Sequence, residues 1–465
     1  MNVLAFDIAS GGLVVALFDE KLAAANLVEI PWHIKLQPDG AAVLTVAALD
    51  NAVVAACARF KGRAIDALSF SAFMHNLVLL DESGQPVSPI FTWMDQRGGA
   101  AVERLRRQFG EEFHYRTGCR YHPMFPVFKL GSLRLPGVRR ISSAKAFLIE
   151  GLTGACAEDR GTASTTGFYN ACEGIWDERI LESVGLSASF LPQLVERDAI
   201  VGNVSRAAAA KYGLPEGTPL IAGSGDGFLA NAGSACDIPG RVAVTLGTSA
   251  SVRRVLPSPF LDDATGTFCY HATSGSYLVG CASNNGGNVL DWARATFAAL
   301  PTEPTKRLDV PVFIPHLYGE RSPDWDSSLK ARWQGVSAHH SREDLVRAVV
   351  EGVMFNLVHY VEILARTSPE PIRQAIISGN GFGAPLTAST LAAVLDVPVL
   401  RPRDAGLASL RGAAACGFRG LGVDPSAVLE GLVANAEVVR GVFPEETRAR
   451  YRRYREVRDR ALETK

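Results

Sequence analysis

The chain has 465 residues, of which 47% are hydrophobic and 20% are charged, and its formal net charge is -1. A chain of this length is too long for one ordinary hydrophobic core, so we expect two domains, or three. The balanced charge gives no strong field toward nucleic acid or an anionic membrane, and neither is expected as a partner.

The first residues and the cysteines together favour a cytoplasmic protein. Asp7 interrupts the first apolar stretch, so we expect no signal peptide. We also expect no apolar run long enough to cross a bilayer. The 8 cysteines are scattered and form no Cys-x-x-Cys pair. Reduced, buried thiols are therefore favoured over disulfides or a zinc site.

Two short hairpins with small residues at their tips stand in the two halves of the chain. Each has a strand, a turn and a second strand, at residues 3–6, 9–12 and 13–18 and at residues 242–245, 246–249 and 250–255. Such turns direct backbone N–H groups and hydroxyls toward an anion. We interpret the pair as an internal duplication, with coincidence between two common hairpins as the alternative. A boundary near Gly240 then predicts domains at residues 1–240 and 241–465.

The other expected elements give both halves an α/β character. Expected strands cover residues 64–69, 77–80, 90–93 and 375–377, and expected helices cover 101–109, 178–184, 289–297, 342–366 and 385–395. Apolar residues recur every three or four positions along 342–366, so this helix should face a core. We also expect a polar hairpin at 153–168 and a charged, mostly solvated helix at 445–462.

The stretch 221–234, IAGSGDGFLANAGS, reads as a strand, a tight turn and the start of a closely packed helix. Asp226 lies between Gly225 and Gly227, and Gly223 comes just before them. Glycines permit a positive φ and the close approach of a ligand. Asp226 is therefore a candidate general base or metal ligand in a cleft, with an ordinary helix N-cap as the alternative.

Several polar side chains between positions 74 and 129 would suit a small polyol site. The candidates are Met74, His75, Asp95, Arg97, His122 and Lys129. Each has a simpler explanation, because a lone histidine is often structural and Asp95 could merely pair with Arg97.

A glycine-rich loop at 379–383 lies between a predicted strand and a helix N-terminus, which would suit a nucleotide. The loop has neither the Gly-Lys-Ser/Thr of a Walker motif nor the spacing of a dinucleotide fingerprint. Tight packing of the strand on the helix explains these glycines about as well.

Several motifs together resemble the FGGY carbohydrate kinase family, from Val3 to about Gly417. The most specific is Ala331-x-Trp333-x-Gly335-Val336, followed after seven residues by Asp344-Leu345-x-x-Ala348-Val349-Val350-Glu351. The segments HLYGERSPDWD, GSGDGFLANAG and TLGTSASV also resemble family segments. MH from Met74, TWMDQR from Thr92 and YHPMFPVFKL from Tyr121 are most similar to the gluconokinase branch, with xylulokinases next.

The resemblance implies an α/β fold of two actin-like (ribonuclease H-like) domains with an interdomain cleft, with sugar on the first domain and ATP mostly on the second. It makes Asp226 the general base on the substrate hydroxyl and Asp7 the carboxylate near Mg²⁺ and the phosphates. The positions implied on the nucleotide side are Ser10, Gly247, Thr248, Gly287, Gly379, Asn380 and Gly381. Met74, His75, Asp95 and Arg97 match the sugar side, and the nearby His122 and Lys129 complete the predicted substrate site.

The predicted activity is ATP-dependent transfer of the γ-phosphate to a hydroxyl of a sugar or sugar acid, with gluconate as the leading substrate. Arg97 is the strongest candidate to bind the carboxylate of gluconate, because a guanidinium can engage it through two parallel hydrogen bonds. The alternatives are a kinase for a ketose such as xylulose and a sugar-binding or regulatory protein with weakened catalysis. A homodimer is an alternative to a monomer.

The chain departs from the family pattern at several positions. Ala9-Ser10-Gly11 replaces Gly-Thr-Thr, Val14 replaces a lysine, Ser132 a tryptophan and Leu407 a glutamate, and the Ser-Gly-Gly loop reads Ser378-Gly379-Asn380. The altered first turn favours the binding protein, whereas the retained Asp226, Asp7 and Thr248 favour the enzyme.

Overall fold

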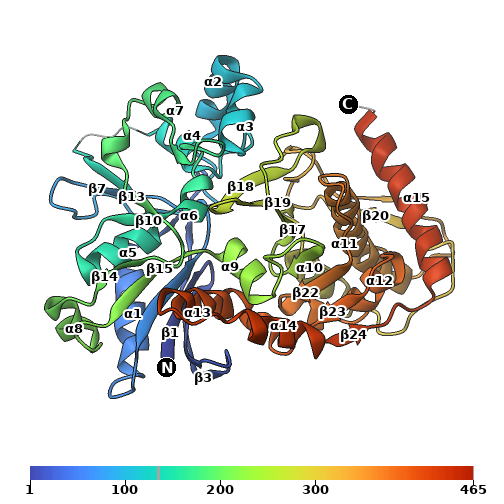
Figure 1. Cartoon of the computed structure of the whole chain (residues 1–465). Coiled ribbons are helices and arrows are strands. Elements are labelled where there is room, and N and C mark those ends of the chain that lie inside the picture. Colours follow the sequence, from blue (N-terminus) through green and yellow to red (C-terminus); the bar gives the residue numbers. More distant parts are fainter. Residues whose placement is uncertain (134–136, 464–465) are drawn as a thin grey trace.

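The structure is a computed structural model that describes residues 1–133 and 137–463. Two mixed β-sheets lie side by side, and helices pack on both (Figure 1). The first sheet has the strand order β14-β15-β6-β1-β2-β3 and the second has the order β18-β19-β17-β16-β22-β23-β24. The strands of the first sheet precede Gly240 and those of the second follow it. We therefore keep Gly240 as the proposed boundary between 1–240 and 241–465.

The strands of the two main sheets are three to eight residues long, and their ends locate the site. The first sheet contains β1 (Asn2–Ala9), β2 (Gly12–Asp19), β3 (Ala24–Pro31), β6 (Ala67–Ala72), β14 (Ile200–Asn203) and β15 (Pro219–Gly225). The second contains β16 (Arg241–Leu246), β17 (Ala250–Leu256), β18 (Phe268–Thr273), β19 (Ser276–Ser283), β22 (Gln374–Ser378), β23 (Val399–Arg401) and β24 (Glu437–Val439).

Shorter strands form small sheets around these two. They are β4 (Lys35–Leu36), β5 (Ala42–Leu44), β7 (Val78–Leu80), β8 (Ile90–Phe91), β9 (Arg140–Ser142), β10 (Ala157–Asp159), β11 (Tyr169–Asn170), β12 (Ile175–Trp176), β13 (Gln193–Val195), β20 (Val312–Ile314) and β21 (Arg332–Gln334).

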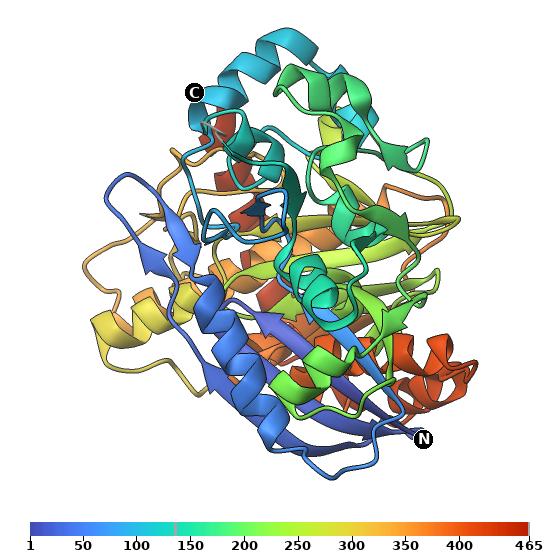
Figure 2. The same cartoon turned by 90° about the vertical axis from the view of Figure 1, so that its left-hand side faces the viewer.

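The helices of the first half are α1 (Val46–Ala58), α2 (Gly99–Phe109), α3 (Glu112–Thr117), α4 (Pro126–Leu130), α5 (Ala144–Thr153), α6 (Arg160–Ser164), α7 (Glu178–Ser183), α8 (Arg206–Tyr212) and α9 (Asp226–Gly233). Those of the second half are α10 (Gly287–Phe297), α11 (Arg342–Ala365), α12 (Thr387–Val394), α13 (Ala408–Gly420), α14 (Ser426–Ala434) and α15 (Pro444–Glu463). Figure 2 shows α1 in front of the first sheet, where it packs on β2 and β3.

The predicted duplication is present in the strand pairing. In the first half, β1 pairs with β2 antiparallel, β6 lies parallel to β1, and β15 lies parallel to β6. In the second half, β16 pairs with β17 antiparallel, β22 lies parallel to β16, and β23 lies parallel to β22. Both hairpin turns and the ends of the parallel strands therefore take equivalent places in the two halves.

Helices α9 and α13 pack against each other at the junction of the two halves. A Cβ atom on Gly233 would lie 1.9 Å from the Ala408 carbonyl oxygen, and one on Gly412 would lie 2.0 Å from the Leu229 carbonyl oxygen. The hydrophobic cluster around this pair includes Val3 from β1 and residues from both sheets. Glycine on each helix is thus required for the close contact that joins the halves.

The long helix α11 is the core helix of the second half, as its periodicity predicts. Contrary to our expectation, it is long and apolar enough by composition to cross a membrane, but 89% of its apolar window is buried inside the protein. Its start is fixed by a capping box, in which Ser341 and Asp344 bond each other's backbone N–H groups. The motif residue Asp344 therefore has a structural role at the helix start.

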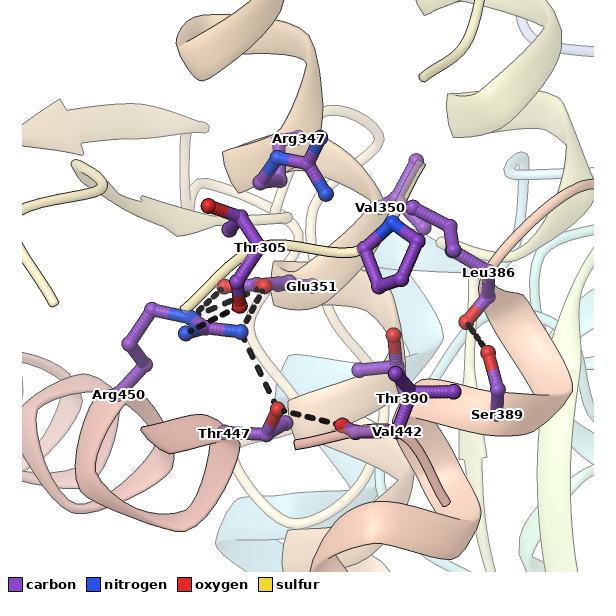
Figure 3. Close-up of a pocket in the computed structure, with 11 residues that line it drawn as sticks. Thr305, Arg347, Val350, Glu351, Leu386, Ser389, Thr390, Val442, Thr447 and Arg450 are labelled. Carbon is purple, nitrogen blue, oxygen red and sulfur yellow. Dashed lines mark hydrogen bonds and ion pairs between the residues drawn. The ribbon is translucent and has the colours of Figure 1, made fainter. Parts of the chain in front are cut away.

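The C-terminal helix α15 differs from the solvated helix that we expected. Tyr454 is 1% exposed and Arg458 is 3% exposed, and Arg450 forms a buried two-point ion pair with Glu351 of α11. A shallow pocket lies between α11, α12 and α15, with this ion pair at its edge (Figure 3). The sequence of α15 suggests a solvated helix because composition does not distinguish an arginine that pairs with a distant residue from an arginine exposed to solvent.

The predicted polar hairpin at 153–168 is wrong. The segment contains β10, which pairs in parallel with β13, and then the short helix α6. Asp159 ends β10 and caps α6, since its side chain accepts a hydrogen bond from the Thr162 N–H. A buried carboxylate that ends a strand and starts a helix thus stands where the polar pattern of 153–168 predicts a hairpin.

Candidate active site

Asp226 is the first residue of α9 and directly follows β15. Gly223 has φ 64°, and a Cβ there would lie 1.7 Å from the Phe70 carbonyl oxygen. A Cβ on Gly225 or on Gly227 would lie 2.8 Å from side-chain atoms of Met74. Gly223 thus allows β15 to lie close to the backbone of β6, and Gly225 and Gly227 allow Met74 to pack beside Asp226.

The Asp226 carboxylate is partly buried and lies near positive charges. Burial raises its pKa, while the positive charges of Arg253 and Arg321 and the N–H groups of Gly227 and Met74 oppose the rise. Oδ1 accepts a hydrogen bond from the Gly227 N–H at 2.7 Å. The N-cap of α9 is Gly225. The arrangement therefore leaves the carboxylate available as a proton acceptor rather than as a helix cap.

A polar network holds the end of β15 in place. The Ser224 hydroxyl donates to Asp159 Oδ2 at 2.5 Å, and Lys145 Nζ lies 2.9 Å from Asp159 Oδ1 and 2.8 Å from Glu158 Oε1. All four residues are at most 3% exposed. We did not predict this network from the sequence, because its members come from three separate segments and match no local motif.

Asp7 lies near the end of β1, level with Ser71 of β6, and Ser71 is in turn level with Ser224 of β15. Burial and the negative charge of Asp226 raise the pKa of Asp7 to about 7, and Ser71 moderates the rise. Among the described residues, its buried Oδ1 has no hydrogen-bond partner. Two carboxylates thus share one region at the ends of parallel strands, and the buried Oδ1 is open to a cation.

The second predicted phosphate turn and the 379–383 loop lie together, because Thr245 and Ser378 are partners in parallel strands. Gly379 has φ 94°, and a Cβ there would lie 2.4 Å from the Leu246 carbonyl oxygen, while one on Gly381 would lie 2.5 Å from the Leu246 side chain. Packing therefore accounts for both glycines, whatever they bind.

The start of α10 completes this group of turns. The Gly287 N–H donates to the Gly247 carbonyl at 2.7 Å, and the Asn288 N–H donates to the Thr248 carbonyl at 3.1 Å. Thr248 and Asn380 are exposed, so both side chains can reach a ligand. The structure brings the predicted nucleotide-side residues of the second half together.

Ser10 stands at the tip of the first turn and connects it to the sugar side. Its hydroxyl oxygen accepts a hydrogen bond from Trp93 Nε1 at 2.9 Å, and its carbonyl accepts one from Trp32 Nε1 at 3.1 Å. Because the hydroxyl accepts from Trp93, its own hydrogen remains available to a phosphate oxygen.

The predicted sugar-side residues His75, His122 and Lys129 are all at most 5% exposed. His75 Nδ1 lies 2.9 Å from the Thr165 carbonyl, and His122 Nδ1 accepts a hydrogen bond from the Met124 N–H at 3.1 Å. Burial lowers the pKa of both histidines to about 3. They are therefore neutral hydrogen-bonding groups at physiological pH.

Lys129 and Arg97 are engaged within the protein. Lys129 Nζ donates to the carbonyls of His75, at 3.0 Å, and Met124. Arg97 Nη2 lies 2.6 Å from Asp95 Oδ2, and its Nε lies 3.1 Å from Oδ1. The pairing of Asp95 with Arg97, which we had kept as an alternative, is what the structure shows.

Two arginines from the second half enter the site, and the sequence analysis assigned neither of them a role. Arg253 of β17 donates to Asn231 Oδ1 at 3.1 Å and Thr245 Oγ1 at 2.9 Å, which connects α9 to the second turn. Arg321 lies over the Trp93 ring, with its guanidinium carbon 5.5 Å from the ring centroid. Of these two arginines, Arg321 lies inside the quoted motif HLYGERSPDWD, and this was the sequence signal that could have pointed to it.

The chain matches the N-terminal domain of the FGGY family of carbohydrate kinases over residues 3–233 and the C-terminal domain of that family over residues 242–421. Gluconokinase from Bacillus subtilis (strain 168) is 32% identical over 329 residues, which are 65% of this chain and 64% of the relative. The chain thus aligns with just under two thirds of that relative's length. Xylulose kinase from the same strain is 27% identical, over 68% of this chain and 66% of the relative.

Two solved structures from Lactobacillus acidophilus share the fold. The ligand-bound xylulose kinase has a TM-score of 0.90 at 24% identity and covers 99% of this chain and 98% of its own. The gluconate kinase has a TM-score of 0.89 at 24% identity, with 98% and 97% covered. The predicted two-domain, actin-like α/β fold is confirmed. With both family domains matched over most of its length, the chain belongs to the FGGY family of carbohydrate kinases.

Proposed function

We propose that the chain is an ATP-dependent carbohydrate kinase that phosphorylates a hydroxyl of a sugar acid, with gluconate as the leading substrate. The observation that carries the proposal is the partly buried Asp226 carboxylate at the β15–α9 junction, beside Asp7 and Arg253. Arg253 donates to Thr245 Oγ1 just before the second turn, which supports a single site made by the carboxylate and the proposed phosphate-side elements.

Asp226 would accept the proton of the substrate hydroxyl. Its raised pKa makes it a stronger base than an exposed aspartate, which helps proton transfer in the transition state. Phosphoryl transfer requires little covalent chemistry from the protein, so positioning and charge compensation dominate. Arg253 would stabilise negative charge near the transferred group, and the Ser224–Asp159–Lys145 network would fix the base.

The residues fit a magnesium ion. A carboxylate oxygen is a ligand that Mg²⁺ accepts, and Asp7 offers a buried Oδ1 with no hydrogen-bond partner among the described residues. When bound with ATP, the ion would neutralise phosphate charge. Asp7 would hold it, directly or through water, while the Ser10 hydroxyl and the turn at Gly247 and Thr248 would face the phosphates.

Gluconate is favoured over xylulose by the named relative with 32% identity and by the Met74, Thr92 and Tyr121 segments. A xylulokinase-like enzyme is the second candidate, because a xylulose kinase is 27% identical. The altered Ala9-Ser10-Gly11 turn keeps a sugar-binding protein with weakened catalysis as a third.

An ADP-release assay with ATP, Mg²⁺ and a panel of gluconate, xylulose and glycerol tests the proposal. We expect gluconate to give the highest kcat/KM, with one phosphate transferred per ADP. A preference for xylulose would support the second candidate. Sugar binding without ADP release on any substrate would support the third.

We further propose that the chain acts in the cytoplasm, which agrees with its 8 free cysteines. A homodimer also stays a proposal, which sedimentation of the purified protein would test.

A further inference from the structure

We propose that Arg321, supplied by the second domain, binds the carboxylate of the substrate, so that the substrate class is the aldonates, linear polyols with a carboxylate at one end. This inference rests on the proposed kinase function. It assigns to Arg321 the role that the sequence alone suggested for Arg97.

Arg97 already has a carboxylate partner. Two of its nitrogen atoms bind the two Asp95 oxygens, at 2.6 and 3.1 Å, and Asp95 is 1% exposed. Moving Arg97 to a substrate would leave the buried Asp95 charge without its partner, which is strongly unfavourable. Lys129 is similarly engaged by two backbone carbonyls.

Arg321 has open donors. It is 8% exposed, its Nη2 donates to the Ser283 carbonyl at 2.8 Å, and its buried Nε has no hydrogen-bond partner among residues 1–133 and 137–463. The charges of Glu320 and Asp226 stabilise the guanidinium, but neither of them is within ion-pair distance of it among the described residues. Burial outweighs these charges and lowers the pKa of Arg321, so a substrate carboxylate bound to the open Nε would stabilise the cation.

The adjacent Glu320 fixes Arg321 without neutralising it at close range. Glu320 accepts hydrogen bonds from the Ser283 hydroxyl at 2.8 Å, from Asn356 Nδ2 at 3.1 Å and from the Arg321 backbone N–H at 2.8 Å. These bonds hold the loop backbone in place, and the Arg321 guanidinium takes no part in them.

Arg321 lies on the sugar side. It covers the Trp93 ring, and it is the largest charge acting on His122, whereas Arg253 is the largest charge acting on Asp226. If Asp226 takes the terminal hydroxyl, the far end of a linear sugar acid extends toward His122 and Arg321. Neutral His75 and His122 would then bind hydroxyls, and the guanidinium would bind the carboxylate.

The loop that carries Arg321 also contacts the first domain, because the Trp325 ring lies 5.8 Å from the ring of His122. Within the second domain, Trp325 Nε1 donates to the Gly266 carbonyl at 2.7 Å, which fixes the tryptophan in this position. A carboxylate held by Arg321 would therefore connect the two domains across the substrate. This gives acid substrates, but not neutral ones, an extra contribution to domain closure.

The test compares gluconate with sorbitol, its neutral six-carbon counterpart, and with xylulose. We expect Arg321→Met to lower kcat/KM for gluconate by about 10²-fold or more, the scale for removing one partner of a buried charge pair, and to change the neutral substrates by less than about fivefold. Arg321→Lys should restore part of the gluconate activity. Arg97→Met is the matched control and should affect all three substrates to the same degree.

Equal losses for gluconate and the neutral substrates in Arg321→Met would overturn the inference, and so would a selective loss of gluconate in Arg97→Met. A wild type that prefers xylulose would overturn the aldonate class while leaving a kinase. A wild type that turns over no substrate would contradict the proposed function; the inference is then decided by calorimetry of gluconate and sorbitol on wild type and Arg321→Met. Loss of gluconate binding alone supports it, and unchanged binding refutes it.

Discussion

Replacing Lys129 by methionine tests whether burial lowers the pKa of this sugar-side lysine. Lys129 is 1% exposed, and burial lowers its pKa from 10.5 to about 7, while Asp95 opposes the decrease and Arg97 adds to it. The unfolded chain keeps this proton up to a pH of about 10.5, and the folded chain keeps it only up to about 7. Between these values the unfolded state binds more protons, so stability rises with pH.

The magnitude follows from the difference in pKa. A shift of 10.5 to about 7 corresponds to roughly 5 kcal/mol at about 1.36 kcal/mol per unit, as an upper limit. Between pH 7 and pH 9 the wild type should therefore gain about 2–3 kcal/mol over Lys129→Met in its free energy of unfolding. The lost hydrogen bonds to His75 and Met124 add a constant that does not depend on pH.

Urea unfolding of both proteins at pH 7, 8 and 9 measures this difference. Lys61→Met, at an exposed lysine, is the matched control and should show no such trend. A difference between wild type and Lys129→Met that stays flat over this range would refute the buried, proton-releasing lysine. A difference that changes in the opposite direction would refute the sign of the argument.

Two further substitutions separate catalysis from structure. Ser10→Ala removes the first-turn hydroxyl that accepts a hydrogen bond from Trp93 Nε1. We expect kcat to fall by about 10²-fold, the scale for one lost donor to developing charge, while the gluconate affinity measured by calorimetry stays unchanged. An unchanged kcat would show that Ser10 does not contact the phosphates. Arg450→Met leaves the buried Glu351 without its two-point partner and should lower the free energy of unfolding by about 3–5 kcal/mol. Arg452→Met, at an exposed position of α15, should change it by less than about 0.5 kcal/mol, and equal effects of the two variants would contradict the buried pair.

Local patterns predicted much of the fold. The two hairpins, the β15–α9 junction at Asp226 and the long helix α11 each depend on neighbours in sequence, through alternation, small turn residues or helical periodicity. The motif-based family assignment is confirmed by the matched domains. The roles given to single residues from the resemblance stay predictions.

Partners distant in sequence could not be predicted in the same way. The segment 153–168 resembles a polar hairpin because nothing nearby in sequence shows that Lys145 and Ser224 contact Asp159. Arg450 looked solvated because Glu351 lies on another helix. Arg97 was a candidate substrate ligand because the same guanidinium can bind either a substrate carboxylate or Asp95, and the sequence does not show which. Only the folded chain separates these alternatives.

The most direct test of the central claim is turnover of Asp226→Asn with ATP, Mg²⁺ and gluconate. Asparagine keeps the size of the side chain and can still accept the Gly227 N–H, but it is not a base. We expect kcat to fall by about 10²-fold or more, with unchanged thermal unfolding and gluconate affinity. Turnover near the wild-type value in a folded variant would contradict the account, because the proton of the substrate hydroxyl would then have another acceptor.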